Sequence, residues 1–423
     1  MNLLERDQKS IWHPYTHIKF KNYLTVERTE GSYIYTQDGR KILDAISSWW
    51  LVTHGHSYEP IIQAIQRQVE RFSQVIFAGF THEPAVNLAE LLLNLLPDHF
   101  SKVFFSDNGS TAVEIGIKMA LQYFYNIGQK RKVILALEGG YHGDTFGAMS
   151  VSGKGVFTAP FEELLFEVQY IPVPTAENIA NIIDNLQNIL QNRDVCAFIA
   201  EPLVQGAGGM VMYESKYLDQ ITALIQQTGA FFIADEVMTG FGRLGKMFAT
   251  DYLTNKPDII CLSKGITGGF LPLGATVVSE NIVQAFNTNE KSQVFFHGHS
   301  FTGNALSCSA AVANIMEIIK NDSLNRIKTL TEFQHKQAEI LQSMPEIKNA
   351  RSFGTILAFD GIVEDVGYLS DLKECVYHFG IQNEVLIRPL GNVIYVMPPY
   401  GTELEDLDRI YQVIQRGIQT NWQ

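Results

Sequence analysis

One carboxylate and one lysine stand at the ends of two apolar runs that are typical of buried strands. Asp235 ends the run 230–234, and Lys264 follows the run 259–263. A lysine in apolar surroundings can lose its proton by desolvation and form a Schiff base with an aldehyde. An aspartate can keep the pyridine nitrogen of pyridoxal 5'-phosphate protonated, so that the ring withdraws electrons. The pair predicts pyridoxal 5'-phosphate chemistry, although Asp and Lys also end strands in many other α/β proteins.

The sequence around this pair leaves room for a flat, bulky cofactor. The segment 265–276 is rich in glycine and other small residues, which core packing does not explain. Val237 is two residues after Asp235, so we expect it on the same strand face, against one side of the ring. Tyr141 lies among flexible glycines and could cover the other side. A turn with an exposed tyrosine is the alternative at that position.

Gly109 and Ser110 join a predicted strand to a predicted helix. Free backbone amides at a helix N-terminus, beside a hydroxyl and an absent side chain, suit the cofactor phosphate. An ordinary helix cap is equally consistent with Asn-Gly-Ser at 108–110.

Two other motifs have competing interpretations. The segment 240–245 spells G-x-G-x-x-G after a predicted strand, but Met238 and Thr239 separate it from the strand end and Arg243 would crowd a pyrophosphate. A nicotinamide oxidoreductase is therefore an alternative that we do not favour. His-Gly-His occurs at 54–56 and 297–299, yet no cysteine or carboxylate completes a zinc set at the usual spacing, so no metal site is expected.

Composition limits the possible partners. The chain has 46% hydrophobic and 18% charged residues and a net charge of −13, so no basic surface for nucleic acid is expected. The four cysteines are isolated in the sequence, as in reduced proteins. The N-terminus lacks a secretory or transit signal, and no apolar run approaches the roughly 18 residues of a membrane span. We expect a cytoplasmic protein with small-molecule substrates.

The order of the predicted elements indicates an α/β protein with a mostly parallel central sheet covered by helices on both faces. With 423 residues the chain exceeds the usual limit of about 250 to 300 residues for one core. We expect a large cofactor-binding domain over 56–323 and a smaller α+β domain over 324–423, with the segment 1–55 packing on the smaller one. Strands are predicted at 102–106, 133–138, 196–201, 230–237, 259–263, 275–279, 356–360, 385–388 and 393–397, and helices at 110–125, 215–228, 325–341 and from 403.

Several longer motifs resemble the class III (ω-amino acid type) aminotransferases, a family of fold-type I pyridoxal-phosphate-dependent transferases, along almost the whole chain. The most specific motifs are Ile11-Trp-His-Pro-Tyr-Thr16, Ser47-Ser-Trp-Trp50, the segment 141–150, Val204-Gln-Gly-Ala-Gly-Gly-Met210, Ile387-Arg-Pro389 and Met397-Pro-Pro-Tyr400. They are similar to the branch of the family that aminates 8-amino-7-oxononanoate to 7,8-diaminononanoate in biotin biosynthesis.

The resemblance implies a role for each matching residue. Lys264 would form the Schiff base, Asp235 would pair with the pyridinium, and Gly109 and Ser110 would hold the phosphate. Tyr141 would stack on the ring, and Tyr15 would act beside the reacting groups. The substrate would be bound by Tyr15, Trp49, Tyr141, Gly298 and Arg388, the last through its carboxylate. The family also implies a homodimer with active sites at the interface, in which His299 and Ser300 would reach the phosphate of the neighbouring subunit's cofactor.

Two details bear on the assignment within the family. Many relatives have Pro-Thr where this chain has His299-Ser300, which keeps the hydroxyl but loses the fixed φ of proline. Relatives that use glutamate look to have a Glu directly after Gln-Gly and an Arg shortly before Pro-Pro. At these two positions this chain has Ala207 and Tyr395. Glutamate is therefore not expected as donor. S-Adenosylmethionine is the donor that we favour. Lysine, another class III ω-transaminase, and a non-catalytic protein on the same scaffold are the alternatives.

Overall fold

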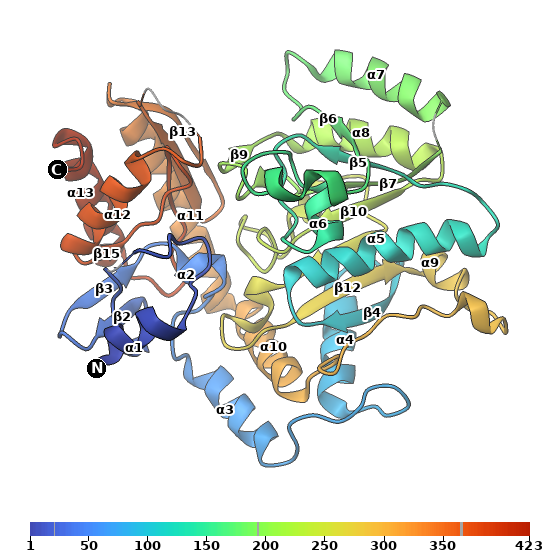
Figure 1. Cartoon of the computed structure of the whole chain (residues 1–423), viewed down its shortest axis with the longest axis horizontal. Coiled ribbons are helices and arrows are strands. Elements are labelled where there is room, and N and C mark those ends of the chain that lie inside the picture. The colour runs from blue at the N-terminus through green and yellow to red at the C-terminus, as the bar shows by residue number, and fades with distance from the viewer. Residues whose placement is uncertain (21, 193, 364–366) are drawn as a thin grey trace.

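The protein is described by a computed structural model over residues 1–20, 22–192, 194–363 and 367–423 (Figure 1). Its largest element is a seven-stranded sheet with the order β4-β12-β11-β10-β7-β5-β6. All strands run parallel except β12, which is antiparallel to both of its neighbours. The expected α/β fold with a mostly parallel sheet is therefore confirmed. The strands are β4 (Phe100–Ser106), β5 (Val133–Leu137), β6 (Gln169–Ile171), β7 (Val195–Ala200), β10 (Phe231–Asp235), β11 (Ile259–Leu262) and β12 (Gly274–Ser279).

Helices cover both faces of this sheet because its central strands are apolar on both sides. In β10, Phe231 and Ile233 pack into a cluster with α5, whereas Phe232 and Ala234 pack into the cluster on the other face. Such alternation follows from the two-residue period of a strand. α5 crosses in front of the sheet in Figure 1. The helices of this part are α3 (Glu59–Val69), α4 (Glu83–Leu95), α5 (Gly109–Asn126), α6 (Phe146–Val151), α7 (Ile179–Asn192), α8 (Ser215–Gln227), α9 (Glu280–Gln284) and α10 (Ala305–Ile318).

The N-terminal and C-terminal segments lie together beside the large sheet, as the blue and red elements of Figure 1 show. A four-stranded sheet has the order β1-β2-β3-β15, in which Leu43 of β3 pairs with Val385 of β15. A second, three-stranded sheet is formed by β13, β14 and β16. The elements are α1 (Leu3–Ser10), β1 (Val26–Glu30), β2 (Tyr33–Thr36), β3 (Lys41–Asp44), α2 (Ser47–Trp50), α11 (Asn321–Gln342), β13 (Ile347–Phe353), β14 (Ile356–Gly361), α12 (Leu372–Gln382), β15 (Val385–Leu386), β16 (Val393–Val396) and α13 (Leu404–Gln419), and a separate hairpin joins β8 (Val204–Gln205) to β9 (Val211–Met212).

The sheet register brings the ends of the central strands together. β10 and β11 are parallel neighbours, with Asp235 opposite Cys261. The residues that follow both strands therefore leave the sheet at one edge, beside the residues that follow β4, β5 and β7. Parallel sheets bind ligands at this carboxyl edge. Among the described residues, no helix has the length and apolar character required to cross a membrane.

Candidate active site

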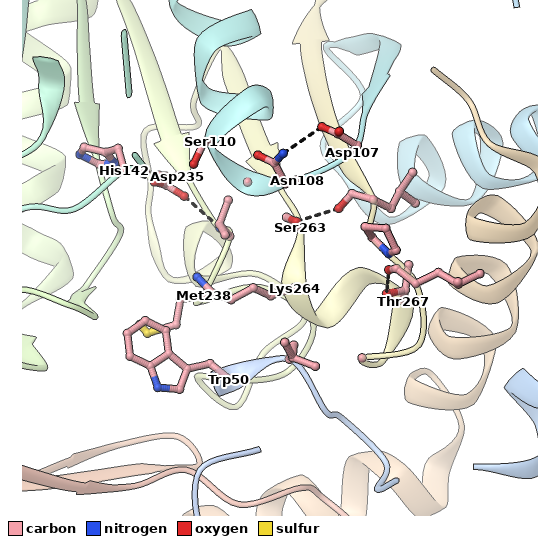
Figure 2. A pocket seen from close by; sticks show the side chains of 18 of the residues that line it. Trp50, Asp107, Asn108, Ser110, His142, Asp235, Met238, Ser263, Lys264 and Thr267 are labelled. Atoms are coloured by element: carbon pink, nitrogen blue, oxygen red, sulfur yellow. Dashed lines mark hydrogen bonds and ion pairs between the residues drawn. The ribbon is translucent and has the colours of Figure 1, made fainter. Parts of the chain in front are cut away.

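A cavity of about 500 Å³ lies at the carboxyl edge of the central sheet (Figure 2). β4 leads into it through Asp107 and Asn108, β10 through Asp235, and β11 through Ser263 and Lys264. In the sequence β4 lies more than a hundred residues before β10 and β11, and the sheet brings the ends of all three strands to one place. Other walls come from Trp50, Leu51, Gly109, Ser110, Tyr141, His142, Gly143, Glu201, Val237, Met238 and the segment 269–273.

Lys264 follows β11 in a backbone conformation that favours glycine. Its φ is 43°, in the left-handed region that residues with a Cβ adopt infrequently. The side chain extends into the cavity, with Nζ 5.0 Å from the centre of the Trp50 ring. Desolvation by the surrounding protein lowers the pKa of Lys264, and the carboxylates of Asp235 and Glu201 oppose only part of that shift. The amine is therefore more readily deprotonated than an exposed lysine, which a nucleophile requires.

Asp235 is buried and held by two hydrogen bonds. Its Oδ2 lies 2.7 Å from Nδ1 of His142, and its Oδ1 accepts a hydrogen bond of 3.0 Å from the backbone N–H of Val237. These contacts fix the plane of the carboxylate at the floor of the cavity. A negative group in this position can stabilise a cationic ring nitrogen.

Two buried site residues were missed in the sequence. His142 follows Tyr141 directly, and its Nε2 has no hydrogen-bond partner among the described atoms. Glu201 follows β7, and its two oxygens accept the backbone N–H groups of Tyr141 at 2.9 Å and Gly206 at 2.8 Å. Burial raises the pKa of Glu201. The available signal was position, because Glu201 ends the predicted strand 196–201 and His142 lies shortly after the predicted strand 133–138, but position alone does not indicate which residues would be their partners.

Two glycines shape the end of the cavity nearest α5. A Cβ at position 109 would lie 2.7 Å from Cγ1 of Val237, and a Cβ at position 143 would lie 2.1 Å from the Ser110 Oγ. Both distances are far below contact, so only glycine fits either place without movement. Ser110 Oγ accepts a hydrogen bond of 3.3 Å from the N–H of Asp144. Asn108 caps α5 through Thr111, as an ordinary helix cap would, while the N-terminus of α5 still faces the cavity.

Aromatic side chains continue from this cavity toward a second one of about 260 Å³. The hydroxyl groups of Tyr15 and Tyr141 are 3.1 Å apart, and Tyr15 also donates a hydrogen bond to Asp144. Burial, followed by the Asp144 carboxylate, raises the pKa of Tyr15 to about 12, so its proton stays in place at neutral pH. Tyr15 packs edge-on to Trp49 with centroids 5.4 Å apart. Phe157 and Tyr368, which line the second cavity, carried no signal in the sequence.

Arg388 lies beside Trp49, at the end of this series of aromatic contacts. Its guanidinium carbon is 5.1 Å from the centre of the Trp49 ring. The side chain is half-buried, and among the described residues it forms no ion pair within 4.0 Å of a carboxylate. The predicted strand 385–388 is shorter than expected, since β15 ends at Leu386 and Arg388 follows in an extended segment. As far as the described residues go, no carboxylate occupies this guanidinium, which can bind an anionic ligand.

The segment 298–300 lies outside the cavity lining of a single chain. His299 Nε2 is 4.0 Å from Oδ1 of Asp107, which itself lines the cavity, whereas Ser300 binds Gln74 through its carbonyl oxygen. A Cβ at position 298 would lie 3.8 Å from Oγ1 of Thr302, which is ordinary van der Waals contact. The single chain therefore places these three residues beside the site, and their predicted ligand contacts remain a prediction.

Another predicted strand was too long, and the structure agrees with setting the dinucleotide alternative aside. The strand predicted over 230–237 ends at Asp235, so Val237 lines the cavity from a turn rather than from the strand face. The segment 240–248 forms turns and no helix, which excludes the helix N-terminus that a dinucleotide fingerprint requires. Arg243 of that segment is buried and donates hydrogen bonds to the carbonyls of Pro398, Trp50 and Val52. No group of three metal-binding side chains was found in the described part of the chain.

Comparison with known proteins places this geometry in a family. The family model described as "Aminotransferase class-III" matches residues 15–418. The chain is 45% identical to the adenosylmethionine-8-amino-7-oxononanoate aminotransferase of Synechococcus elongatus, over 96% of this chain and 97% of that protein. The enzyme of the same name from Staphylococcus aureus is 34% identical over 98% and 97%. The crystal structure of the enzyme of this name from Methanocaldococcus jannaschii superimposes with a TM-score of 0.92, at 35% identity and 98% coverage of both chains.

Proposed function

The chain belongs to the class III aminotransferase family and is therefore an aminotransferase, and we propose that it transfers an amino group to the ketone of 8-amino-7-oxononanoate in biotin biosynthesis. The observation that carries the substrate proposal is Arg388, which has no carboxylate partner among the described residues and lies against Trp49, whose ring contacts Tyr15. The acceptor suits a cation beside aromatic side chains, because an apolar chain of five methylene groups separates its carboxylate from its ketone. Its product would be 7,8-diaminononanoate.

We propose pyridoxal 5'-phosphate as the cofactor, as the family implies, and the residues of the cavity fit it. Gly109, Gly143 and Ser110 leave an open anion site at the N-terminus of α5 for the phosphate. Asp235 would face the ring nitrogen, with Val237 and Tyr141 as walls for the ring. When bound, the cofactor supplies an aldehyde for amines and a ring that withdraws electrons from the reacting carbon.

The chain's own residues then position and move protons. His142 and the N–H of Val237 hold Asp235 in one orientation, so its negative charge stays at the nitrogen end of the site. Desolvation lowers the pKa of Lys264, so its Nζ could accept a proton from the carbon that carries the substrate amine and donate it to the reacting carbon of the cofactor. Tyr15, with its raised pKa, remains a hydrogen-bond donor at neutral pH.

Substrate binding would use both ends of the site. The carboxylate would bind the Arg388 guanidinium, and the apolar chain would lie along Trp49, Tyr15 and Tyr141. Gly298 would approach the substrate from the neighbouring subunit's side of the site.

S-Adenosylmethionine is the proposed amino donor, which is the donor that the names of the relatives contain. Tyr395 supports the exclusion of glutamate, because it stands at the sequence position where glutamate-using relatives look to have an Arg. Its hydroxyl accepts a hydrogen bond of 2.9 Å from Nε1 of Trp50. Ala207 lines the second cavity and offers no carboxylate there. Lysine remains the competing donor for the test below.

A homodimer with its active sites at the interface is proposed as the working assembly. Four large apolar side chains, Ile76, Phe80, Phe296 and Phe301, are more than 60% exposed. Hydrogen bonds from Gln74 to Ser300 and from Asn304 to Gln74 join their two loops, which supports the proposal that the four side chains belong to one patch. A patch of this kind marks an interaction surface. It borders Asp107 through His299, which supports the proposal that His299 and Ser300 serve the neighbouring subunit's cofactor phosphate.

The division into parts and the location are also proposals. The pairing of β3 with β15 supports a small domain built from 1–55 and 324–423 next to a large domain over 56–323. The four cysteines are free thiols, which supports a cytoplasmic location.

The test uses the purified full chain with pyridoxal 5'-phosphate and 8-amino-7-oxononanoate. S-Adenosylmethionine or lysine is supplied as donor in separate reactions, and 7,8-diaminononanoate is measured by mass spectrometry. Formation of the diamine with S-adenosylmethionine is the expected result. Diamine formation with lysine alone would change the donor. If neither donor supports it while a simple ω-amine and pyruvate react, the enzyme is another class III transaminase.

A further inference from the structure

Four consecutive residues of α2 have a left-handed backbone. The φ angles of Ser47, Ser48, Trp49 and Trp50 are 51°, 44°, 77° and 75°. None of them is glycine, and for residues with a Cβ this conformation is strained and normally limited to single positions. The N–H of Trp50 donates to the carbonyl of Ile46 and the N–H of Leu51 to that of Ser47, so the segment is a turn of left-handed helix. Strain of this kind persists only where the surroundings enforce it, and it concentrates at functional sites.

The turn places two tryptophans at opposite ends of the active site. The Trp50 ring faces Lys264 Nζ at 5.0 Å, and the Trp49 ring lies 5.1 Å from the guanidinium carbon of Arg388. Trp49 also contacts Tyr15. A right-handed turn at this place would send the two side chains in other directions, so the handedness determines what the site presents to a ligand.

A buried carboxylate holds the first half of this turn. Asp44, which is fully buried, accepts the N–H of Ile46 at 3.1 Å on Oδ1. On Oδ2 it accepts the Ser48 hydroxyl at 2.7 Å and contacts His56 Nε2 at 2.9 Å. The backbone of His56 is itself fixed, because it exchanges two hydrogen bonds with Gly31.

Two further side chains hold the turn. The Ser47 hydroxyl, at its start, donates to the carbonyl of Met397, and Arg243 donates to the carbonyl of Trp50, at its end, and to that of Val52 just beyond it. The Asp44 carboxylate thus accepts hydrogen bonds at the start of the turn, and the Arg243 guanidinium donates hydrogen bonds to the carbonyls at its end. His56 lies outside the turn and forms no part of the cavity lining.

We infer that Asp44 and His56 are positioning residues for the transfer reaction, which lock the left-handed turn so that Trp49 meets the substrate at Arg388 and Trp50 meets Lys264. This inference rests on the proposed function in so far as Trp49 is taken to line the substrate. The two residues touch neither the cavity nor the reacting groups, so they act through the tryptophans.

His54 provides a matched control on the same His-Gly-His loop. It is half-buried like His56 and forms its own hydrogen bond, with Nε2 3.3 Å from the carbonyl of Asn314, but within the described chain it forms no hydrogen bond with residues 47–50. His56→Leu removes the hydrogen bond to Asp44, whereas His56→Gln keeps a donor of similar reach. His54→Leu removes a buried histidine contact without loosening the turn.

The first measurement needs neither cofactor nor substrate. Acrylamide quenching of tryptophan fluorescence is compared in a Trp12→Phe background, because Trp12 is 80% exposed and would dominate the signal. His56→Leu is expected to increase quenching, His56→Gln to restore most of the protection, and His54→Leu to leave it unchanged. Equal quenching in all three variants would overturn the inference even if the proposed substrate were wrong.

The second measurement is kcat/KM for the keto acid in a double-mutant cycle with Trp49→Ala. His56→Leu is expected to lower it about tenfold to 100-fold, as small misplacements of substrate-positioning groups do, and to have little further effect once Trp49 is absent. Full additivity would show that His56 does not act through Trp49. If His56→Leu fails to fold, Ser48→Ala removes a single donor from Asp44 and is carried through the same cycle with the same expected direction. Inactivity of the wild type toward the keto acid would reject the proposed function and leave the quenching result standing.

Discussion

Replacing Arg388 by alanine tests the carboxylate end of the proposed site. The side chain is half-buried, its guanidinium lies over Trp49, and it has no carboxylate partner in the described chain. Truncating one member of a buried, hydrogen-bonded charge pair costs about 2 to 5 kcal/mol. Since Arg388 is not fully buried, we expect the lower part of that range, about 2 to 4 kcal/mol. This corresponds to a loss of about 30-fold to 700-fold in kcat/KM for the keto acid.

The decisive assay compares the keto acid with its methyl ester. Arg388→Ala should lose activity with the acid and lose little with the ester, because only the acid forms the charged contact. Arg388→Lys should recover activity in part, since an ammonium group cannot form two parallel hydrogen bonds. Arg409→Ala is the control, because Arg409 has similar exposure but is already paired with Glu384 at 2.8 Å. Equal losses for acid and ester would make Arg388 a structural residue and would remove the main support for a carboxylate at this end.

Three further outcomes concern the cofactor end. Lys264→Ala should purify as a folded protein, checked by circular dichroism, with no amino transfer; full turnover would reject its role. Asp235→Asn should retain cofactor in the absorbance spectrum and lose orders of magnitude in kcat, because an amide cannot keep the ring nitrogen protonated; an unchanged kcat would show that Asp235 faces something else. Burial lowers the pKa of Lys264, so between the folded and unfolded pKa values the folded state binds fewer protons at this site. The resulting destabilisation is present below the folded pKa and disappears as pH rises toward about 10.4. Lys264→Met without cofactor should therefore unfold at higher urea than the wild type at pH 7, with a difference that shrinks toward pH 10; a constant difference would contradict the assignment.

The central sheet could be predicted from the sequence because its strands are apolar on both faces. The runs at 133–138, 196–201 and 259–263 all became strands within a residue or two of the expected ends. Asp235 and Lys264 were placed correctly relative to the sheet for the same reason, since a charge after an apolar run marks a strand end. The prediction that the strand 230–237 extends to Val237 failed because the Asp235 carboxylate accepts the N–H of Val237 and turns the chain.

Contacts between distant segments could not be predicted in the same way. Glu201 and His142 each follow a strand, but their roles depend on backbone N–H groups and carboxylates that only folding brings near. The left-handed turn at 47–50 has no glycine to indicate it, since its conformation is imposed by Asp44, Arg243 and their neighbours. A sequence pattern indicates the backbone conformation that neighbouring residues favour. Strained segments arise where tertiary contacts impose a different conformation.

The two ends of the site come from different parts of the chain, and this separates reactivity from selectivity. Lys264 and Asp235 belong to the edge of the large sheet, whereas Arg388 follows β15 of the small four-stranded sheet. The turn that carries Trp49 and Trp50 connects the two sheets. It follows β3, which pairs with β15, and its Trp50 carbonyl accepts a hydrogen bond from Arg243, which lies in a loop after β10 of the large sheet. Changes at the sheet edge should therefore abolish transfer for every substrate. Changes at Arg388 or in the turn should instead alter which chain length and which terminal charge are accepted, because they move one end of the substrate relative to a reacting centre that stays in place.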